Sequence, residues 1–148
     1  MKIYMDVCCL NRPFDDLAQD RIQFESDAVL SIIARCESGQ WRLVSSEVID
    51  LEIKRQTDLE RLKKVQALCS ASRERLILTE AAQSRAKEFQ KHGIKVLDSL
   101  HLAIAEIWRI DVFLTTDDAL LRAAGRIAVR MVVANPVTWL MEVLRNER

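Results

Sequence analysis

The sequence has little glycine and proline, with 3 Gly and 2 Pro among its 148 residues. Apolar residues make up 49% of the chain and charged residues 30%, which is typical of a globular, helix-rich protein. A chain of this length is long enough to bury a substantial core. We therefore expect a single domain over residues 1–148.

The chain also lacks net charge, because 22 Lys and Arg residues balance 22 Asp and Glu residues. Overall basicity therefore gives no argument for nucleic-acid binding, and such a partner would need a local basic patch or a bound metal. No apolar run approaches the ~20 residues of a membrane-spanning helix.

The four cysteines form no CxxC pair; they are Cys8, Cys9, Cys36 and Cys69. No signal peptide is recognisable. This pattern predicts reduced thiols in a cytoplasmic protein, with a disulfide or a zinc site as the alternative.

The first segment, residues 2–7, is a short apolar run interrupted by a carboxylate, Asp6. An apolar run without polar alternation is typical of a central parallel strand that is covered on both faces. Ligands of open parallel sheets bind outside the carboxyl ends of the strands, so Asp6 is the first candidate site residue.

Strand-like and helical patterns alternate along the rest of the chain. Further strands are expected at residues 41–45, 75–79, 111–115 and 128–133. Helices are expected at residues 21–38, 47–52, 59–70, 80–92, 96–109, 116–125 and from 136 onward, with a loop at 9–20. This alternation predicts the α/β class, with a parallel sheet covered on both faces through right-handed crossovers.

Acidic residues follow two of the strands and lie near the start of two helices. They are Asp6, Glu47, Asp50, Glu52, Asp98 and Asp117. Asp98 lies in the first turn of a helix beside apolar Leu97 and Leu100. A carboxylate there costs free energy unless it is paired, hydrogen-bonded or bound to a metal.

Each acid alone has an ordinary structural explanation. Asp98 and Asp117 can stabilise helix N-termini, an effect worth ~0.3–1 kcal/mol, and Glu52 can be a solvated helix residue. Asp6 fits this explanation least, because no helix is expected for it to cap.

If three or four carboxylates converge at one sheet edge, they raise each other's pKa values. A divalent cation relieves this repulsion, and oxygen ligands suit Mg²⁺ or Mn²⁺ rather than Zn²⁺. Magnesium recruits phosphate oxygens, so the implied substrate is a phosphate ester. Two such ions about 4 Å apart can activate a water for in-line displacement.

Four segments, spread over nearly the whole chain, together resemble the PIN-domain nucleases. They are Ile-Tyr-Met-Asp at 3–6, Val-Ser-Ser-Glu-Val-Ile-Asp-Leu-Glu-Ile at 44–53, Leu-Asp-Ser-Leu-His-Leu-Ala at 97–103 and Phe-Leu-Thr-Thr-Asp at 113–117. The resemblance implies a three-layer α/β/α sandwich with a parallel five-stranded sheet of order 3-2-1-4-5. Strands one and four would then be neighbours, which brings Asp6 and Asp117 together.

By the same resemblance, the catalytic and metal-binding acids are Asp6, Glu52, Asp98 and Asp117. Glu52 rather than Glu47 matches the family glutamate, because it falls six residues after the motif serine, Ser46. Thr115 matches a supporting hydroxyl that precedes the last aspartate.

The chain departs from the family at Cys8, where many members carry Ser, Thr or Asn. A thiol is a poor Mg²⁺ ligand, so either a water takes that role or the activity is weak. Asp118 is either the extra acid that some members place after the last motif aspartate or a solvated helix residue. Asn11 or Arg12 either touches the substrate or belongs to an ordinary turn.

Two further features have two explanations each. His101, one turn after Asp98, either assists catalysis or packs in the interior. A basic cluster either binds RNA phosphates or is a solvated helix face. The cluster consists of Lys54, Arg55, Arg61, Lys63 and Lys64.

The resemblance implies a Mg²⁺- or Mn²⁺-dependent endoribonuclease that hydrolyses RNA to 5′-phosphate and 3′-hydroxyl products. Many such proteins are the toxin of a toxin–antitoxin pair, in the VapC-like group. The implied partners are RNA, an antitoxin protein and a second copy in a homodimer.

The alternative is a non-catalytic PIN-like module that binds RNA or a protein partner. Other α/β folds with acids at strand ends are disfavoured. A phosphoaspartate hydrolase needs Asp where Cys8 stands, and a receiver domain needs Lys after the fifth strand, where residues 133–135 are Val-Ala-Asn.

Overall fold

The structure, a computed structural model, describes residues 1–147 and contains one five-stranded, wholly parallel sheet. Its strands are β1 (Lys2–Met5), β2 (Arg42–Ser46), β3 (Glu74–Leu76), β4 (Val112–Leu114) and β5 (Val132–Ala134). The order is β3-β2-β1-β4-β5, so the predicted α/β class and the implied strand order are confirmed.

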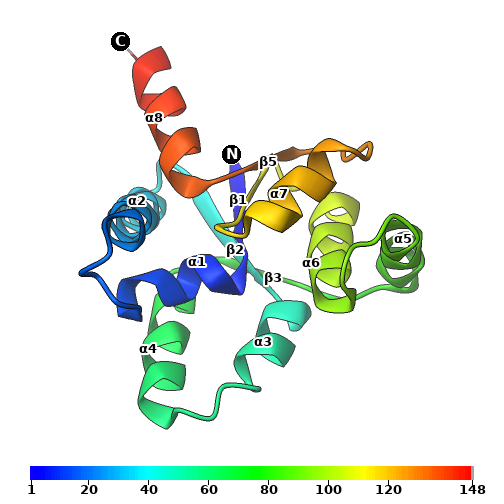
Figure 1. Cartoon of the computed structure of the whole chain (residues 1–148), viewed down its shortest axis with the longest axis horizontal. Helices are drawn as coiled ribbons and strands as arrows, with labels where there is room; N and C mark the ends of the chain where they lie inside the picture. Colours follow the sequence, from blue (N-terminus) through cyan, green and yellow to red (C-terminus); the bar gives the residue numbers. More distant parts are fainter. Residues whose placement is uncertain (148) are drawn as a thin grey trace.

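Within residues 1–147, eight α-helices and one 3₁₀ helix, η1, connect and cover these strands. They are α1 (Val7–Asn11), η1 (Arg12–Phe14), α2 (Asp20–Glu37), α3 (Glu47–Ile53), α4 (Leu59–Cys69), α5 (Glu80–Gln90), α6 (Val96–Ile107), α7 (Asp118–Gly125) and α8 (Pro136–Asn146). Figure 1 shows α2 and α8 on one side of the sheet and α5 and α6 on the other, which makes a three-layer α/β/α arrangement. None of the helices in residues 1–147 has the length and apolarity needed to cross a membrane.

The segment after β1 differs from the sequence-based expectation of a loop. Helix α1 begins directly at Val7, and Asp6 is its N-cap, with Oδ1 accepting a hydrogen bond from the Val7 N–H at 2.8 Å. The expectation that Asp6 has no helix to cap is therefore wrong. A helix of five residues is too short to show a 3.6-residue apolar period in the sequence.

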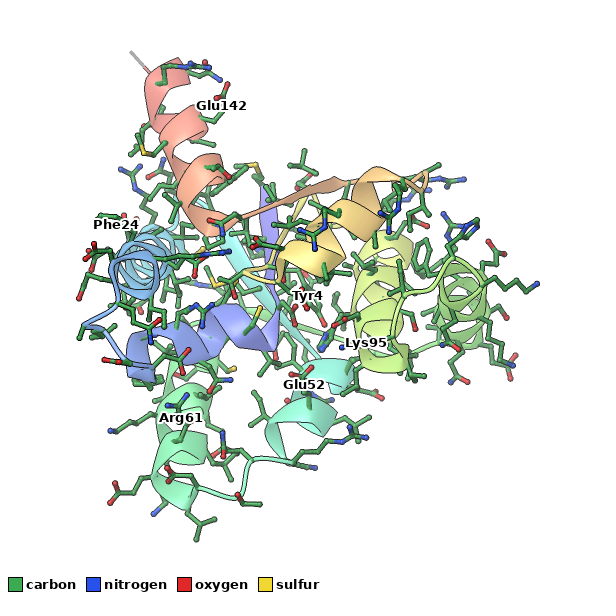
Figure 2. All side chains as sticks on the ribbon, in the orientation of Figure 1. Tyr4, Phe24, Glu52, Arg61, Lys95 and Glu142 are labelled. Atoms are coloured by element: carbon green, nitrogen blue, oxygen red, sulfur yellow. The ribbon has the colours of Figure 1, made fainter. Side chains whose placement is uncertain are left out.

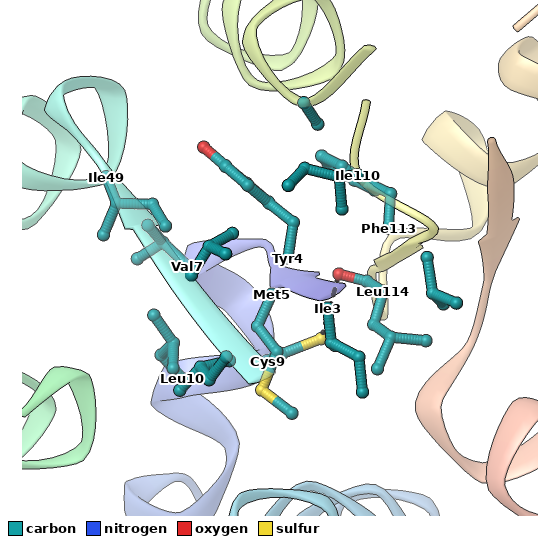
Figure 3. Packing of buried hydrophobic residues seen from close by; sticks show 14 of the residues in the cluster. Ile3, Tyr4, Met5, Val7, Cys9, Leu10, Ile49, Ile110, Phe113 and Leu114 are labelled. Atoms are coloured by element: carbon teal, nitrogen blue, oxygen red, sulfur yellow. Dashed lines mark hydrogen bonds between the residues drawn. The ribbon is translucent and has the colours of Figure 1, made fainter. Parts of the chain in front are cut away.

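The central position of β1 is confirmed by its burial. Ile3, Tyr4 and Met5 are each at most 1% exposed, and Tyr4 and Met5 point to opposite faces of the strand (Figure 3). The Tyr4 ring stacks on Phe113 of β4, with ring centroids 5.2 Å apart and planes at 10°. The outer strands β3 and β5 are shorter than expected, with three residues each.

The register of β1 and β4 brings their carboxyl ends to one edge of the sheet. Met5 pairs with Leu114, and the Asp6 N–H donates to the Leu114 carbonyl at 2.9 Å. Asp6 and Thr115 therefore leave the sheet side by side. Ser46, the last residue of β2, lies at the same edge because β2 runs parallel to β1.

The buried carboxylate of Glu25, in α2, connects that helix by hydrogen bonds to η1 and to the start of α8. It is 1% exposed and accepts hydrogen bonds from Arg12 Nε at 2.8 Å, Arg21 Nε at 3.2 Å and Asn135 Nδ2 at 2.7 Å. Arg12 belongs to η1, and Asn135 caps α8. Glu25 thus holds the segment after α1 and the start of α8 against α2.

We expect Glu25→Ala to lower the free energy of unfolding by about 2–3 kcal/mol. Breaking a buried ion pair costs roughly 3–5 kcal/mol, and the partial exposure of Arg12 and Arg21 reduces that cost. Urea denaturation measures the change. Glu142→Ala is the matched control, because Glu142 pairs with Arg145 on the surface and its loss should change stability by less than about 0.5 kcal/mol. Equal effects of the two substitutions would contradict the fastening role of Glu25.

Candidate metal centre

Asp6 lies at the carboxyl end of β1 and is 4% exposed. Its Oδ2 accepts hydrogen bonds from Thr115 Oγ1 at 3.0 Å and from Cys8 Sγ at 3.4 Å, while Oδ1 accepts from the backbone of α1. Burial raises the pKa of Asp6, and the charge of Glu52 adds to that rise. Asp6 is therefore a buried, firmly oriented carboxylate.

Thr115 links Asp6 to the turn that carries Asp117. The Thr115 hydroxyl donates to Asp6 and accepts a hydrogen bond from the Asp117 N–H at 3.1 Å. Asp117 is the N-cap of α7, and both capping bonds, from Ala119 N at 2.9 Å and Leu120 N at 3.2 Å, use its Oδ1. The capping role considered for Asp117 is present, and its backbone N–H is linked to Asp6 through the Thr115 hydroxyl.

Glu52 reaches the same region from α3, and Figure 2 labels it on that helix, below Tyr4 in the view. Its Oε1 is 2.7 Å from Nε2 of His101 in α6, and that nitrogen is 3.9 Å from Oδ1 of Asp6. Asp6, Glu52 and His101 each offer a ligand atom, and these three atoms lie within 4.8 Å of one another.

Asp98, in the first turn of α6, is the fourth predicted acid. The pKa of Asp98 is raised to about 6, mainly by burial and in addition by the charges of Asp6 and Asp117, with a smaller contribution from Glu52. Asp98 is therefore within electrostatic reach of the other three acids. The four predicted site residues come from the ends of β1 and β4 and from α3 and α6. Asp6 and Glu52 belong to the close group with His101, whereas Asp98 and Asp117 lie outside that group and Asp98 senses the other acids through their charge.

The donor set fits a hard divalent cation. Carboxylate oxygens are the ligands that Mg²⁺ and Mn²⁺ prefer, and the charges of Asp6 and Asp117, which add to the effect of burial on the pKa of Asp98, are charges that a cation would compensate. Asp6, Glu52, Asp98 and Asp117 are the residues that could hold such an ion.

Cys8 lies inside this group. Its Sγ is 3.3 Å from Thr115 Oγ1 and accepts a hydrogen bond from the Thr116 N–H at 3.3 Å, besides its contact with Asp6. The thiol thus takes the place beside Asp6 where the resemblance leads one to expect a hydroxyl or an amide.

Asp118 and Asn11 are engaged outside the acidic group. Arg21 forms a bidentate pair with Asp118, with both N–O distances at 2.8 Å, and this lowers the pKa of Asp118. Asn11 donates to the Val7 carbonyl at 3.1 Å and accepts from Arg61 Nη1 at 3.4 Å. The charge of Asp118 is therefore paired with the Arg21 guanidinium, and the amide of Asn11 is held in one orientation.

A cavity of about 280 Å³ adjoins Glu52. Its apolar floor includes Val7 and Val65, and its polar lining includes Asn11 and Arg55. A larger cavity, of about 910 Å³, lies at the opposite end of the sheet, and none of the four acids lines it. The cavity beside Glu52 therefore adjoins one of the four acids.

The basic cluster divides into two parts. Lys54, Arg55, Lys63 and Lys64 are exposed. Arg61 is partly buried and donates to Asp15 Oδ1 at 2.6 Å and to the Phe14 carbonyl at 2.7 Å, so it holds the end of η1 against α4.

Reasoning from the sequence missed Tyr4 and left two explanations for His101. Both are 0% exposed, and Tyr4 Oη lies 2.6 Å from His101 Nδ1. The signal for Tyr4 was a hydroxyl in an otherwise aliphatic central strand. The signal for His101 was its position one turn after Asp98, on the face of α6 that packs against the sheet.

No protein-family model matches this chain, and no curated protein does so either. Among solved structures, the chain is similar to a chain in the crystal structure of VapBC2 from Rickettsia felis bound to a DNA fragment from their promoter. The TM-score is 0.62 and the sequence identity 11%, over 91% of this chain and 98% of that chain. The TM-score establishes a shared fold, and at this low identity the likeness shows the fold alone. It confirms the PIN-like three-layer fold that the sequence motifs imply.

We expect Asp98→Asn to stabilise the metal-free protein at pH 7.5 by about 1–2 kcal/mol. The folded-state pKa of Asp98 is about 6 against an ordinary 3.8, so wild-type stability falls as the pH rises through this interval. One pKa unit corresponds to about 1.4 kcal/mol, and partial exposure of Asp98 reduces the full effect.

Chemical denaturation with a chelator present, at pH 7.5 and at pH 4, measures this difference between variant and wild type. The gain from Asp98→Asn should shrink toward zero at pH 4, where Asp98 is largely protonated. Asp27→Asn, at an exposed position of α2, is the control and should show little pH-dependent difference. An Asp98→Asn variant that is less stable than wild type at pH 7.5 would contradict crowding among the acids.

Proposed function

We propose that this chain is a metal-dependent endoribonuclease that hydrolyses RNA phosphodiester bonds, with residues 1–148 forming a single domain. Its metal ligands in this proposal are Asp6, Glu52, Asp98 and Asp117. One observation carries the proposal: a ligand atom from each of Asp6, Glu52 and His101 lies within 4.8 Å of the other two at the carboxyl edge of the sheet. The shared fold with a chain of the VapBC2 structure supports a nuclease of the VapC-like group.

Mg²⁺ or Mn²⁺, when bound, supplies a water of lowered pKa and charge stabilisation for an in-line displacement at phosphorus. The chain's own residues orient the ligands. Thr115 and the α1 backbone hold the two oxygens of Asp6, and His101 holds Glu52. The burial of Asp6 keeps bulk water from one side of the site.

The partners in this proposal are RNA, an antitoxin protein and a second copy of the chain in a cytoplasmic homodimer. VapBC2 crystallised bound to a promoter DNA fragment, and a toxin–antitoxin pair is the corresponding proposal for this chain. An antitoxin peptide would lie across the acidic site, and an arginine of that peptide could pair with the carboxylates. The exposed side chains Lys54, Arg55, Lys63 and Lys64 are candidates for contacts with RNA phosphates.

A second candidate is a non-catalytic PIN-like module that binds RNA or a protein partner. The Cys8 thiol favours it, because a poor Mg²⁺ ligand packs directly against Asp6 and Thr115. The two candidates differ in whether the wild-type protein breaks the phosphodiester bond.

We expect Asp6→Asn to reduce RNA cleavage in Mn²⁺ by about 100-fold or more, because the substitution removes a charged ligand and weakens transition-state charge stabilisation. Gel analysis of end-labelled RNA measures the rate, and a chelator should abolish the wild-type reaction. Asp27→Asn serves as the control and should cleave like wild type.

Binding of the same RNA by Asp6→Asn, measured by fluorescence anisotropy, separates loss of chemistry from loss of binding. Wild-type protein that binds this RNA but cleaves none over a full Mn²⁺ titration would reject the nuclease and favour the module.

A further inference from the structure

A buried row of polar side chains ends at Glu52 and is drawn from four different elements. Ser46 ends β2, Tyr4 lies in β1, His101 lies in α6 and Glu52 lies in α3. The contacts are 2.8 Å from Ser46 Oγ to Tyr4 Oη, 2.6 Å from Tyr4 Oη to His101 Nδ1 and 2.7 Å from His101 Nε2 to Glu52 Oε1. We call this row the Tyr4 relay.

The hydrogen-bond direction along the relay follows from counting donors and acceptors. Ser46 Oγ already accepts the Ile49 N–H at 3.0 Å as the N-cap of α3. Among residues 1–147, Tyr4 Oη is the acceptor within hydrogen-bond distance of the Ser46 hydroxyl. Ser46 therefore donates to Tyr4, and Tyr4 donates to His101 Nδ1.

His101 then carries its proton on Nε2 and donates it to the Glu52 carboxylate. The opposite direction would leave the Ser46 hydroxyl without an acceptor in a site that is 0% exposed, which costs free energy. In a neutral imidazole, the opposite direction would also place the proton on Nδ1 and turn the Nε2 lone pair toward the Glu52 carboxylate. Burial raises the pKa of Tyr4 well above its ordinary value, so its hydroxyl keeps the proton that it donates.

Packing fixes the two rings of the relay. Tyr4 stacks on Phe113 and meets His101 edge-on, with ring centroids 5.7 Å apart and planes at 69°. Figure 3 shows Tyr4 among the buried side chains of β1 and β4. The rings therefore have little freedom to turn, and the orientation of Glu52 is set by the core of the fold.

We infer that Tyr4 and His101 are positioning residues that hold the Glu52 carboxyl group turned toward Asp6, where it could bind a divalent cation. The inference rests on the proposed function, which makes Glu52 a metal ligand. It also assigns His101 a supporting role: its Nε2 lies 3.9 Å from Asp6 Oδ1 but carries a proton, so it is not itself a ligand.

The protonation of His101 can be read in the metal-free protein by ¹⁵N NMR. We expect a pyrrole-type nitrogen at Nε2 and a pyridine-type nitrogen at Nδ1 in the wild-type protein near pH 7.5. His92 is exposed and provides the internal comparison of a solvated histidine. A proton on Nδ1, alone or together with Nε2, would overturn the direction of the relay.

The effect on metal affinity is tested with Mn²⁺ alone, by calorimetry in the absence of RNA. We expect Tyr4→Phe and His101→Leu to weaken Mn²⁺ binding by about 10- to 100-fold, which is typical when the group orienting a ligand is lost. His101→Gln keeps an N–H donor for Glu52 and should recover part of the affinity. His92→Gln is the matched control and should bind like wild type.

Tyr4→Phe preserves the ring and its packing, so it keeps the test valid if His101→Leu does not fold. Unchanged Mn²⁺ affinity in Tyr4→Phe would overturn the inference. So would ¹⁴N coupling from His101 in the electron spin echo signal of bound Mn²⁺, because that coupling would make His101 a ligand.

RNA cleavage by the same samples separates this inference from the proposed function. Weakened Mn²⁺ binding in the variants, together with a wild-type protein that cleaves no RNA, would support the relay and reject the nuclease. RNA cleavage by the wild-type protein, together with equal Mn²⁺ affinities of the wild type and the variants, would support the nuclease and reject the relay. A wild-type protein that binds no Mn²⁺ would overturn both.

Discussion

Carboxylates that are crowded at the edge of a sheet repel one another, and a fold that brings them there must compensate the repulsion. In this chain Asp6 is buried, and Asp98 has its pKa raised to about 6 by burial and by its acidic neighbours. Hydrogen bonds offset part of the cost: Thr115 donates to Asp6 and His101 donates to Glu52. The remaining charge is what a divalent cation would neutralise, and the proposed nuclease chemistry depends on that cation.

The parallel sheet is what makes the crowding possible. Because β1 and β4 are neighbours in matched register, the residues that follow them, Asp6 and Thr115, leave the sheet together. The same strand β1 supplies Tyr4, one of whose neighbours is His101 of α6. Core packing and site geometry therefore share residues, so a substitution made in the core at Tyr4 reaches a proposed metal ligand through two hydrogen bonds.

Much of the fold could be predicted from the sequence, because alternating strands and helices leave clear periodic patterns. The strand order and the four acids came from the resemblance to PIN-domain nucleases, and the order is confirmed. The short helix α1 could not be seen, since five residues hold little more than one turn. The Tyr4 relay was hidden for a different reason: its members lie far apart in the chain, and only the packed sheet brings Ser46, Tyr4 and His101 within hydrogen-bond distance.

The central claim is that one divalent-cation site is formed by four carboxylates from separate parts of the chain. The most direct measurement is anomalous X-ray diffraction from crystals of the protein soaked in Mn²⁺. The account predicts anomalous density among Asp6, Glu52, Asp98 and Asp117. Density confined to other parts of the molecule, or none at these acids at saturating Mn²⁺, would contradict it.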